Sequence, residues 1–186
     1  MMKHIGTVRL ETERLILRRF AREDAAAMFA NWANDPEVAR YVLWEPHGTV
    51  DVTQQLLADW VDSYEKPDFY QWAMELKETG ELIGGISSVH AQDDIAMTEI
   101  GYCIGKAWWR KGYASEALTR LVQFFFEDVG LNRVESRFDP RNLGSGKVME
   151  KAGLQYEGTM RESELLKGER CDTVHYAMLA KDYFGR

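Results

Sequence analysis

The spacing of apolar residues along the chain predicts a domain that mixes strands and helices. Two-residue alternation, typical of strands with one buried face, recurs in both halves. Apolar residues three or four positions apart, typical of amphipathic helices, separate several of these segments. The predicted strands are 8–10 with 13–20, 69–76, 81–89, 97–105, 133–138, 155–164 and 170–179. The predicted helices begin at residues 22 and 34 or cover 51–64, 114–128 and 142–153. This order predicts an α/β (α+β) fold.

One apolar stripe marks the expected core of the sheet. Tyr70, Trp72 and Met74 share a face of the 69–76 segment by the two-residue period of a strand. Large apolar side chains in such a stripe are more often buried core than ligand-binding surface. We expect this segment to form a hairpin with residues 81–89.

Composition places the chain among globular proteins. Its 186 residues are 45% apolar and 12% aromatic, which suits a single domain over 1–186. No apolar run approaches the ~20 residues that span a bilayer, and the start lacks a signal-peptide pattern, so we expect a cytoplasmic protein with no membrane partner. The net charge of −7 argues against direct nucleic-acid binding.

The cysteines and histidines predict neither a disulfide framework nor a metal site. Cys103 and Cys171 offer at most one disulfide, and a free buried thiol is the expectation for Cys103 in its predicted core strand. The four histidines are scattered without ligand spacing, so we expect no metal.

A strand, a tight basic turn and a helix follow one another between residues 97 and 128. The turn carries Arg110, Lys111 and Gly112, and helical spacing begins at Ala114. Consecutive backbone N–H groups in such a turn, together with the positive end of the helix, favour an anion, and Gly112 lets a ligand approach the backbone closely. The pattern predicts a diphosphate-binding turn; a basic helix start with a glycine is the alternative interpretation.

In this context the turn resembles the acetyl-CoA-binding signature of the GNAT acyltransferases, a Gln/Arg-x-x-Gly-x-Gly/Ala turn before a long helix. Gly112 and Ala114 occupy the last two motif positions, and Trp109 stands where Gln or Arg is usual. The resemblance implies a single GNAT-like domain, whose mostly antiparallel sheet of six or seven strands has helices on both sides and a splayed strand pair for acetyl-CoA. It assigns the diphosphate to Arg110, Lys111, Gly112, Tyr113 and Ala114.

Two other segments carry the same resemblance. Residues 12–18, Thr-Glu-Arg-Leu-Ile-Leu-Arg, resemble the opening of the ribosomal-protein N-terminal acetyltransferase branch (RimJ/RimL type). Asn142 and Ser145 resemble the Asn-x-x-Ser…Gly-Phe motif, with Leu154 in place of Phe. In relatives this Asn and Ser lie against the pantetheine and thiol end of CoA, and the Ser can donate to the departing thiolate.

The resemblance also suggests how the remaining roles are filled. Backbone amides of the strand that holds Tyr102, Cys103 and Ile104 are the expected partners of the thioester oxygen. Glu164 resembles the base of the ribosomal-protein branch, and Glu99 resembles the fourth-strand glutamate that other GNAT enzymes use. Either glutamate could instead be an ordinary solvated strand residue, and we rank Glu164 slightly ahead.

The implied activity is acetyl transfer from acetyl-CoA, without a metal, to a primary amine. The first expectation for the acceptor is a protein N-terminus, such as that of a ribosomal protein. A small-molecule amine (a polyamine or an aminoglycoside) and a non-catalytic acyl-CoA-binding module are the alternatives. A homodimer is a possible assembly. We expect a small first residue on the acceptor, because the thioester is expected to lie between strands lined by Tyr102, Tyr70 or Trp72.

Overall fold

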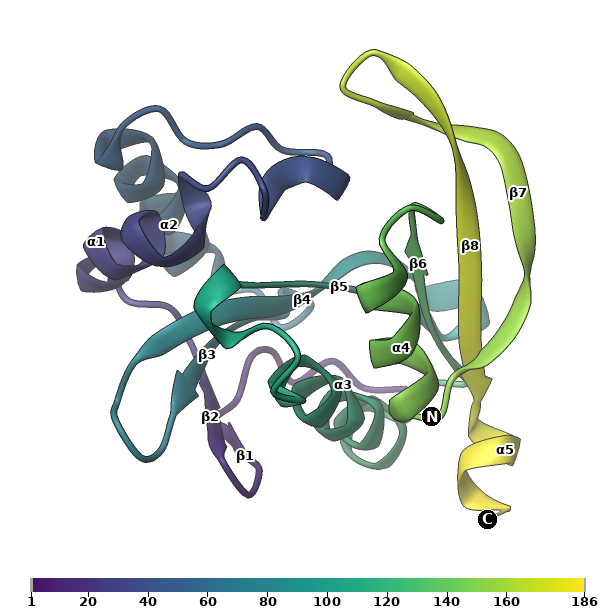
Figure 1. Ribbon diagram of the computed structural model, residues 1–186. Coiled ribbons are helices and arrows are strands. Elements are labelled where there is room, and N and C mark those ends of the chain that lie inside the picture. Colours follow the sequence, from purple (N-terminus) through teal and green to yellow (C-terminus); the bar gives the residue numbers. More distant parts are fainter. Residues whose placement is uncertain (1, 186) are drawn as a thin grey trace.

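The alternating segments assemble into one sheet of eight strands, ordered β1-β2-β3-β4-β5-β6-β8-β7 (Figure 1). The structure, a computed structural model, describes residues 2–185. Strands β5 and β6 run parallel, and the other neighbouring pairs are antiparallel. The strands are β1 Leu10–Glu11, β2 Leu15–Arg18, β3 Gln71–Leu76, β4 Leu82–Gln92, β5 Met97–Ile104, β6 Arg133–Phe138, β7 Gln155–Leu166 and β8 Glu169–Leu179. The predicted fold is confirmed, with one strand more than the six or seven expected, the two-residue β1.

Helices cover both faces of this sheet (Figure 1). They are α1 Ala25–Met28, α2 Val50–Ser63, α3 Tyr113–Phe124, α4 Leu143–Lys151 and α5 Ala180–Phe184. Trp72 of β3 packs edge-on against Phe124 of α3, with ring centroids 5.5 Å apart. The next residue, Ala73, belongs instead to a cluster with Met28 of α1 and Leu57 of α2. Adjacent strand residues point to opposite faces, so α3 lies over one face of the sheet, and α1 and α2 lie over the other.

The predicted apolar stripe is the centre of the core. Tyr70, Trp72 and Met74 are buried, and Tyr70 stacks on Trp72 with ring centroids 5.8 Å apart. Burying each such side chain stabilises the fold by roughly 1.5–3 kcal/mol. Because Tyr70 and Trp72 pack against α3, the expectation that they line the acceptor site is wrong.

One predicted helix, that beginning at residue 34, is wrong. The chain turns there and forms a short 3₁₀ helix at Ala39–Tyr41. The Asp35 carboxylate accepts a hydrogen bond from the backbone N–H of Glu37 at 2.8 Å. Such a local side-chain bond offers the backbone an alternative to the helix. The helix predicted from residue 22 is also broken, with a 3₁₀ turn before α1 and a π-helical turn, Phe29–Ala33, after it.

The remaining predicted elements are confirmed within a few residues. The helical turns after α3 continue through Phe125–Val129 and end at Gly130, whose φ of 80° is left-handed. Strands β7 and β8 form a long hairpin that extends past the rest of the sheet (Figure 1). Both cysteines are free. Within residues 2–185, the structure contains no helix long and apolar enough to cross a membrane.

Candidate active site

Strands β5 and β6 separate partway along their length. Their register ends at the pair Glu99 and Glu135, whereas the register of β5 with β4 continues to Ile104. Just past the last pair, the Ser136 hydroxyl donates to the Ile100 carbonyl at 2.7 Å. This side-chain bond satisfies a buried carbonyl where the ladder stops. The expected splayed pair is therefore present. Beyond Glu99, β5 diverges from β6, and its edge on that side is one that an extended ligand can join.

The basic turn before α3 has the backbone shape of an anion site. Arg110 and Gly112 are left-handed, with φ of 62° and 86°, and α3 begins at the next residue, Tyr113. Alternation between left- and right-handed residues curls consecutive N–H groups around one point, and the helix end adds positive potential. A non-glycine residue pays roughly 1–2 kcal/mol for this conformation. The strain at Arg110 is typical of a functional turn.

Glu116, in the first turn of α3, ties this turn to the start of β2. Its carboxylate accepts hydrogen bonds from the Thr12 hydroxyl at 2.5 Å, the Arg14 backbone N–H at 2.8 Å and Arg14 Nε at 2.7 Å. Arg14 also donates to the Lys111 carbonyl at 3.0 Å and lies 4.5 Å from the centroid of the Tyr113 ring. Two motifs about a hundred residues apart therefore form one structure. Sequence reasoning missed Glu116 because an acidic residue is common in any first helical turn.

Asn142 and Ser145 meet at the start of α4. Asn142 Nδ2 donates to Ser145 Oγ at 3.1 Å, and the Tyr102 hydroxyl donates to the Ser145 carbonyl at 3.0 Å. Since Oγ accepts the first bond, its own hydrogen is directed elsewhere. Burial raises the pKa of Tyr102, which keeps this hydroxyl protonated as a donor. The tyrosine thus fixes the first turn of α4 beside the part of β5 that has left β6.

Gly146 sets how closely α4 approaches β6. A Cβ atom added at this glycine would lie 2.7 Å from Cζ of Phe138, closer than side chains pack. At Gly144 an added Cβ would meet Asn142 Oδ1 at 3.5 Å, an ordinary contact. Packing therefore explains the glycine at 146 and leaves that at 144 unexplained.

The predicted oxygen-binding residues of β5 have side chains in different environments. Tyr102 contacts α4, whereas Cys103 packs against the cluster beneath α1 and α2. Burial raises the pKa of the Cys103 thiol to about 11, so the thiol is neutral at pH 7. The Ile104 carbonyl accepts a bond from Trp109 Nε1 at 2.7 Å. Trp109, which departs from the GNAT turn motif, therefore anchors the turn to the end of β5.

The two candidate bases share one arginine. Arg137 Nε lies 3.0 Å from an oxygen of Glu99, and Arg137 Nη2 lies 3.0 Å from an oxygen of Glu164. The side chains of Glu99 and Glu164 are 12% and 21% exposed, so both are partly shielded from water. Two residues that the sequence gives as alternatives thus lie in one cluster, at the last paired position of β5 and β6.

Burial raises the pKa of Glu99 above that of an ordinary glutamate, and the charge of Glu135 raises it further. The positive charge of Arg137 lowers this pKa, with smaller effects of the same sign from His175 and His90. A carboxylate with a raised pKa is a stronger base in its ionised form. These effects favour proton uptake at Glu99.

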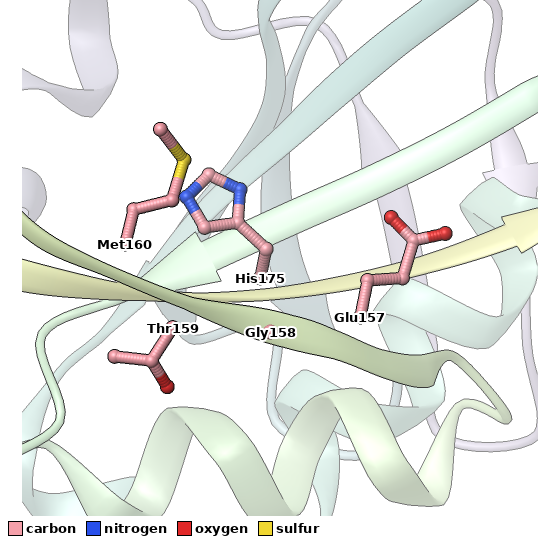
Figure 2. Close-up of a pocket in the computed structure, with 5 residues that line it drawn as sticks. All are labelled: Glu157, Gly158, Thr159, Met160 and His175. Atoms are coloured by element: carbon pink, nitrogen blue, oxygen red, sulfur yellow. The ribbon is translucent and has the colours of Figure 1, made fainter.

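Strand β8 contributes His175 to the same face of the sheet. His175 lies directly across from Arg137 in the register of β6 with β8, so their side chains share a face. The imidazole Nε2 lies 2.8 Å from the Thr173 hydroxyl oxygen. Figure 2 shows His175, Met160 and Glu157 projecting to one side of the β7–β8 hairpin, and Thr159 to the other. Thr159 therefore lies on the opposite face of the hairpin from His175.

The tip of the β7–β8 hairpin touches the segment that precedes α2. Lys167 Nζ donates to the Ala39 carbonyl at 2.8 Å and lies 3.3 Å from a Glu45 carboxylate oxygen. In that loop, Trp44 packs against the α1–α2 cluster and meets His47 edge-on, with centroids 6.0 Å apart. Trp44 therefore anchors this surface loop to the α1–α2 cluster.

A mixed eight-stranded sheet with one splayed strand pair, and a left-handed turn just before α3, define the class of fold. A sequence model of the acetyltransferase (GNAT) domain matches residues 14–155. The chain belongs to this family of N-acetyltransferases, and GNAT enzymes use acetyl-CoA.

Relatives in bacteria are similar over nearly the whole chain. The uncharacterised N-acetyltransferase p20 of Bacillus licheniformis is 33% identical, over 95% of this chain and 98% of that protein. The [ribosomal protein uS5]-alanine N-acetyltransferase of Escherichia coli (strain K12) is 25% identical, over 97% and 95% of the two chains. The crystal structure of a GNAT-family acetyltransferase from Bacillus anthracis superposes with a TM-score of 0.82 at 26% identity, over 94% and 99%.

Proposed function

We propose that this N-acetyltransferase acetylates the α-amino group of a protein N-terminus. The observation that carries the proposal is the carboxylate pair Glu99 and Glu164, held by Arg137 where β5 and β6 separate. A carboxylate at this point can take a proton from an amine that approaches the open strand edge. Two facts support this kind of acceptor. The Thr12–Arg14 opening, which resembles the ribosomal-protein branch, bonds Glu116 in the first turn of α3. A relative at 25% identity is named for an alanine of ribosomal protein uS5.

The backbone of the turn and the polar side chains at the start of α4 support binding of the acetyl-CoA that the family uses. The left-handed backbone at Arg110 and Gly112 suits the diphosphate, and a Cβ added at Gly112 would first meet a flexible arginine side chain, at 3.4 Å. Residues 110–114 would hold the diphosphate, and Asn142 and Ser145 would lie along the pantetheine arm. The donor supplies an acetyl thioester, whose C–S bond breaks as the amine forms the new C–N bond.

The residues of this chain supply the proton transfers. The acceptor ammonium gives a proton to the Glu99 and Glu164 pair and becomes a neutral nucleophile. Glu99 is the deeper carboxylate and the one whose pKa is raised by burial, so we place it ahead of Glu164, which the sequence ranks first. As the C–N bond forms, the nitrogen loses a second proton and the leaving thiolate gains one, so CoA departs as a thiol. Ser145 donates a hydrogen bond to the leaving sulfur. A backbone N–H of β5 among residues 102–104 receives the thioester oxygen.

An α-amino group is the amine best matched to carboxylate bases. Its pKa near 8 leaves a useful fraction neutral at pH 7, whereas a lysine amine near 10.4 is far harder to deprotonate. A glutamate with a modestly raised pKa therefore suffices for an N-terminus. A small first residue is expected, because bulk beside the amine would hold it outside the ~3–3.5 Å attack distance.

Mass spectrometry of acetylated products tests the acceptor. The panel contains Ser- and Ala-initiated peptides, the same peptides with blocked N-termini and one internal lysine, and small polyamines and aminoglycosides. We expect acetyl-CoA-dependent product from the free N-termini, and at least ~10-fold less from the lysine-only peptides because of the difference in amine pKa. Product from the small amines alone would overturn the N-terminal assignment and leave the family activity intact.

The proposed donor at Ser145 is tested by the variant Ser145→Ala. Loss of a hydrogen bond to the leaving sulfur is expected to lower kcat by ~10²-fold, with acetyl-CoA affinity within about twofold of the parent. Ser63→Ala is the matched control, since that hydroxyl bonds the Asp59 carbonyl within α2, far from the splayed strands. Steady-state kinetics with isothermal titration of CoA separates the two effects. An unchanged kcat in Ser145→Ala would contradict the role.

A further inference from the structure

Arg137 lies between the two candidate bases, and the proposed reaction gives the arginine itself no step. Its guanidinium reaches Glu99 on β5 with Nε and Glu164 on β7 with Nη2, each at 3.0 Å. The arginine lies on β6, two residues beyond the last pair with β5. It thus spans the region in which β5 and β6 diverge and connects a central strand of the sheet with the edge hairpin.

The charges around this cluster come from every neighbouring strand. Across from Glu99 lie His90 of β4 and Glu135 of β6, and across from Arg137 lies His175 of β8. Glu135 is itself paired with Arg133 at 2.7 Å, and Arg133 is also paired with Glu157 of β7. With neutral histidines, Glu99, Glu164 and Arg137 therefore carry a net charge of −1. One proton brings the group to neutrality.

We propose that Arg137 is a positioning residue that holds Glu99 and Glu164 together and ionised, so that the pair accepts one proton from the acceptor ammonium in each cycle. This inference rests on the proposed function. Before transfer, the guanidinium offsets one of two adjacent negative charges. After transfer, the N–H bond of the ammonium has broken, the proton is on a carboxylate, and the other carboxylate remains paired with Arg137. Release of that proton to water restores the cluster.

The geometry explains why an arginine suits this task. A guanidinium presents several donors in a rigid planar fork and is always charged, so it can hold two carboxylates in fixed relative positions. Without it, two carboxylates in one shielded site repel each other, and one of them becomes protonated at a higher pH. The cation therefore determines the pH above which the base is in its active, ionised form.

The variant Arg137→Met removes the charge and keeps much of the aliphatic stem. The acid limb of the pH–rate profile of kcat/KM is expected to move upward by about one pH unit, the shift that a neighbouring opposite charge produces. At pH values below both acid limbs, activity is then about tenfold lower than that of the parent, whereas activity near pH 9 is close to the parent value. Arg137→Lys is expected to restore part of the shift, since the charge returns without the fork.

The matched control is Arg133→Met, which removes another arginine from the same strand and face that also bridges two glutamates. Arg133 contacts neither Glu99 nor Glu164 at ion-pair distance. We therefore expect the acid limb of Arg133→Met to move by less than about a third as much as that of Arg137→Met. A uniform loss of rate in Arg137→Met at every pH, with the acid limb unmoved, would overturn the inference.

A second readout needs no acceptor and separates this inference from the proposed function. The carboxyl ¹³C resonance of Glu99, assigned with Glu99→Gln, is titrated in the parent, Arg137→Met and Arg133→Met. An upward movement confined to Arg137→Met supports the electrostatic part of the inference even if N-terminal peptides prove not to be substrates. An unmoved titration overturns it. A moved titration with an unmoved acid limb, for whatever amine is the acceptor, would overturn the link to proton transfer.

Discussion

At the scale of single residues, left-handed backbone positions determine what the turn before α3 can bind. Gly112 and Gly80 have similar φ values, 86° and 71°, but different surroundings. Gly112 precedes α3 in the proposed diphosphate site, whereas Gly80 lies in the turn between β3 and β4. Comparing substitutions at these two glycines therefore separates the loss of stability caused by backbone strain from the loss of acetyl-CoA affinity caused by blocking the site.

Replacing Gly112 with alanine is expected to weaken acetyl-CoA binding by roughly tenfold or more, because a Cβ and a distorted turn displace N–H groups from the phosphate. Gly80→Ala is the control, since both variants should lose about 1 kcal/mol of stability from left-handed strain. Thermal unfolding and calorimetric titration of acetyl-CoA measure the two effects. Equal acetyl-CoA affinities in the two variants would contradict the site.

A candidate site residue is easiest to recognise from sequence where its residue type is uncommon for that kind of structural element. The Asn142 and Ser145 pair and the Gly112 turn fall in this group: Asn142 bonds Ser145 and Gly112 is left-handed, while their roles toward acetyl-CoA stay predictions. Arg137 could not be found this way, because an arginine in an exposed strand position is usually solvated. Its importance depends on Glu99 and Glu164, which are brought to it by strands far apart in the sequence.

At the scale of elements, the contact between β2 and α3 ties the N-terminal motif to the turn proposed to bind the diphosphate. Burial raises the pKa of Glu116, but the hydrogen bonds from Thr12 and Arg14 outweigh burial, and the pKa lies below the ordinary value. A lowered pKa means that the folded state favours the ionised carboxylate. The stabilisation is fully present above the pKa of an unfolded glutamate and is lost as the pH falls through the lower pKa of the folded state.

The variant Glu116→Gln should raise the KM for acetyl-CoA several-fold, because the turn loses its fixed contact with β2, and leave kcat near the parent value. The parent should be more stable than the variant at pH 7, and this difference should shrink below about pH 4.5. Glu127→Gln is the control: its carboxylate bonds Gln123 and Tyr183 at the other end of the same helix. Steady-state kinetics measures the KM for acetyl-CoA, and chemical unfolding at several pH values measures the difference in stability. An equal KM for acetyl-CoA in the two variants would contradict the proposed link between β2 and the turn.

Elements were predictable where one periodicity dominated a segment. The hairpin of β3 with β4 and the strands β6, β7 and β8 occur within a few residues of the expected bounds. The helix expected from residue 34 fails because Asp35 forms a local turn, which apolar spacing does not register. The early strand expected over 8–10 with 13–20 divides into two short strands, β1 and β2, which pair antiparallel.

At the scale of the whole molecule, the proposed acceptor side is bounded by two segments that meet at Lys167. The hairpin of β7 and β8 carries Glu164 and His175, and its tip bonds the Ala39 carbonyl in the loop that precedes α2. The lysine backbone is left-handed, with φ of 51°, in a turn that presents its side chain to that loop. The contact therefore joins the element that carries one candidate base to the segment on the acceptor side.

Removing this contact with Lys167→Met should loosen both segments and weaken acceptor binding. We expect the KM for the acceptor to rise about three- to tenfold, since a charged donor to a carbonyl is lost, while the KM for acetyl-CoA stays unchanged because the turn before α3 lies elsewhere. Faster hydrogen exchange in residues 39–45 should accompany the change. Arg170→Met is the matched control, because Arg170 pairs with Glu162 inside the hairpin, at 3.9 Å between exposed side chains. If both variants kept the parent acceptor KM while exchange in residues 39–45 rose only in Lys167→Met, the contact would stabilise the loop without contributing to the acceptor site.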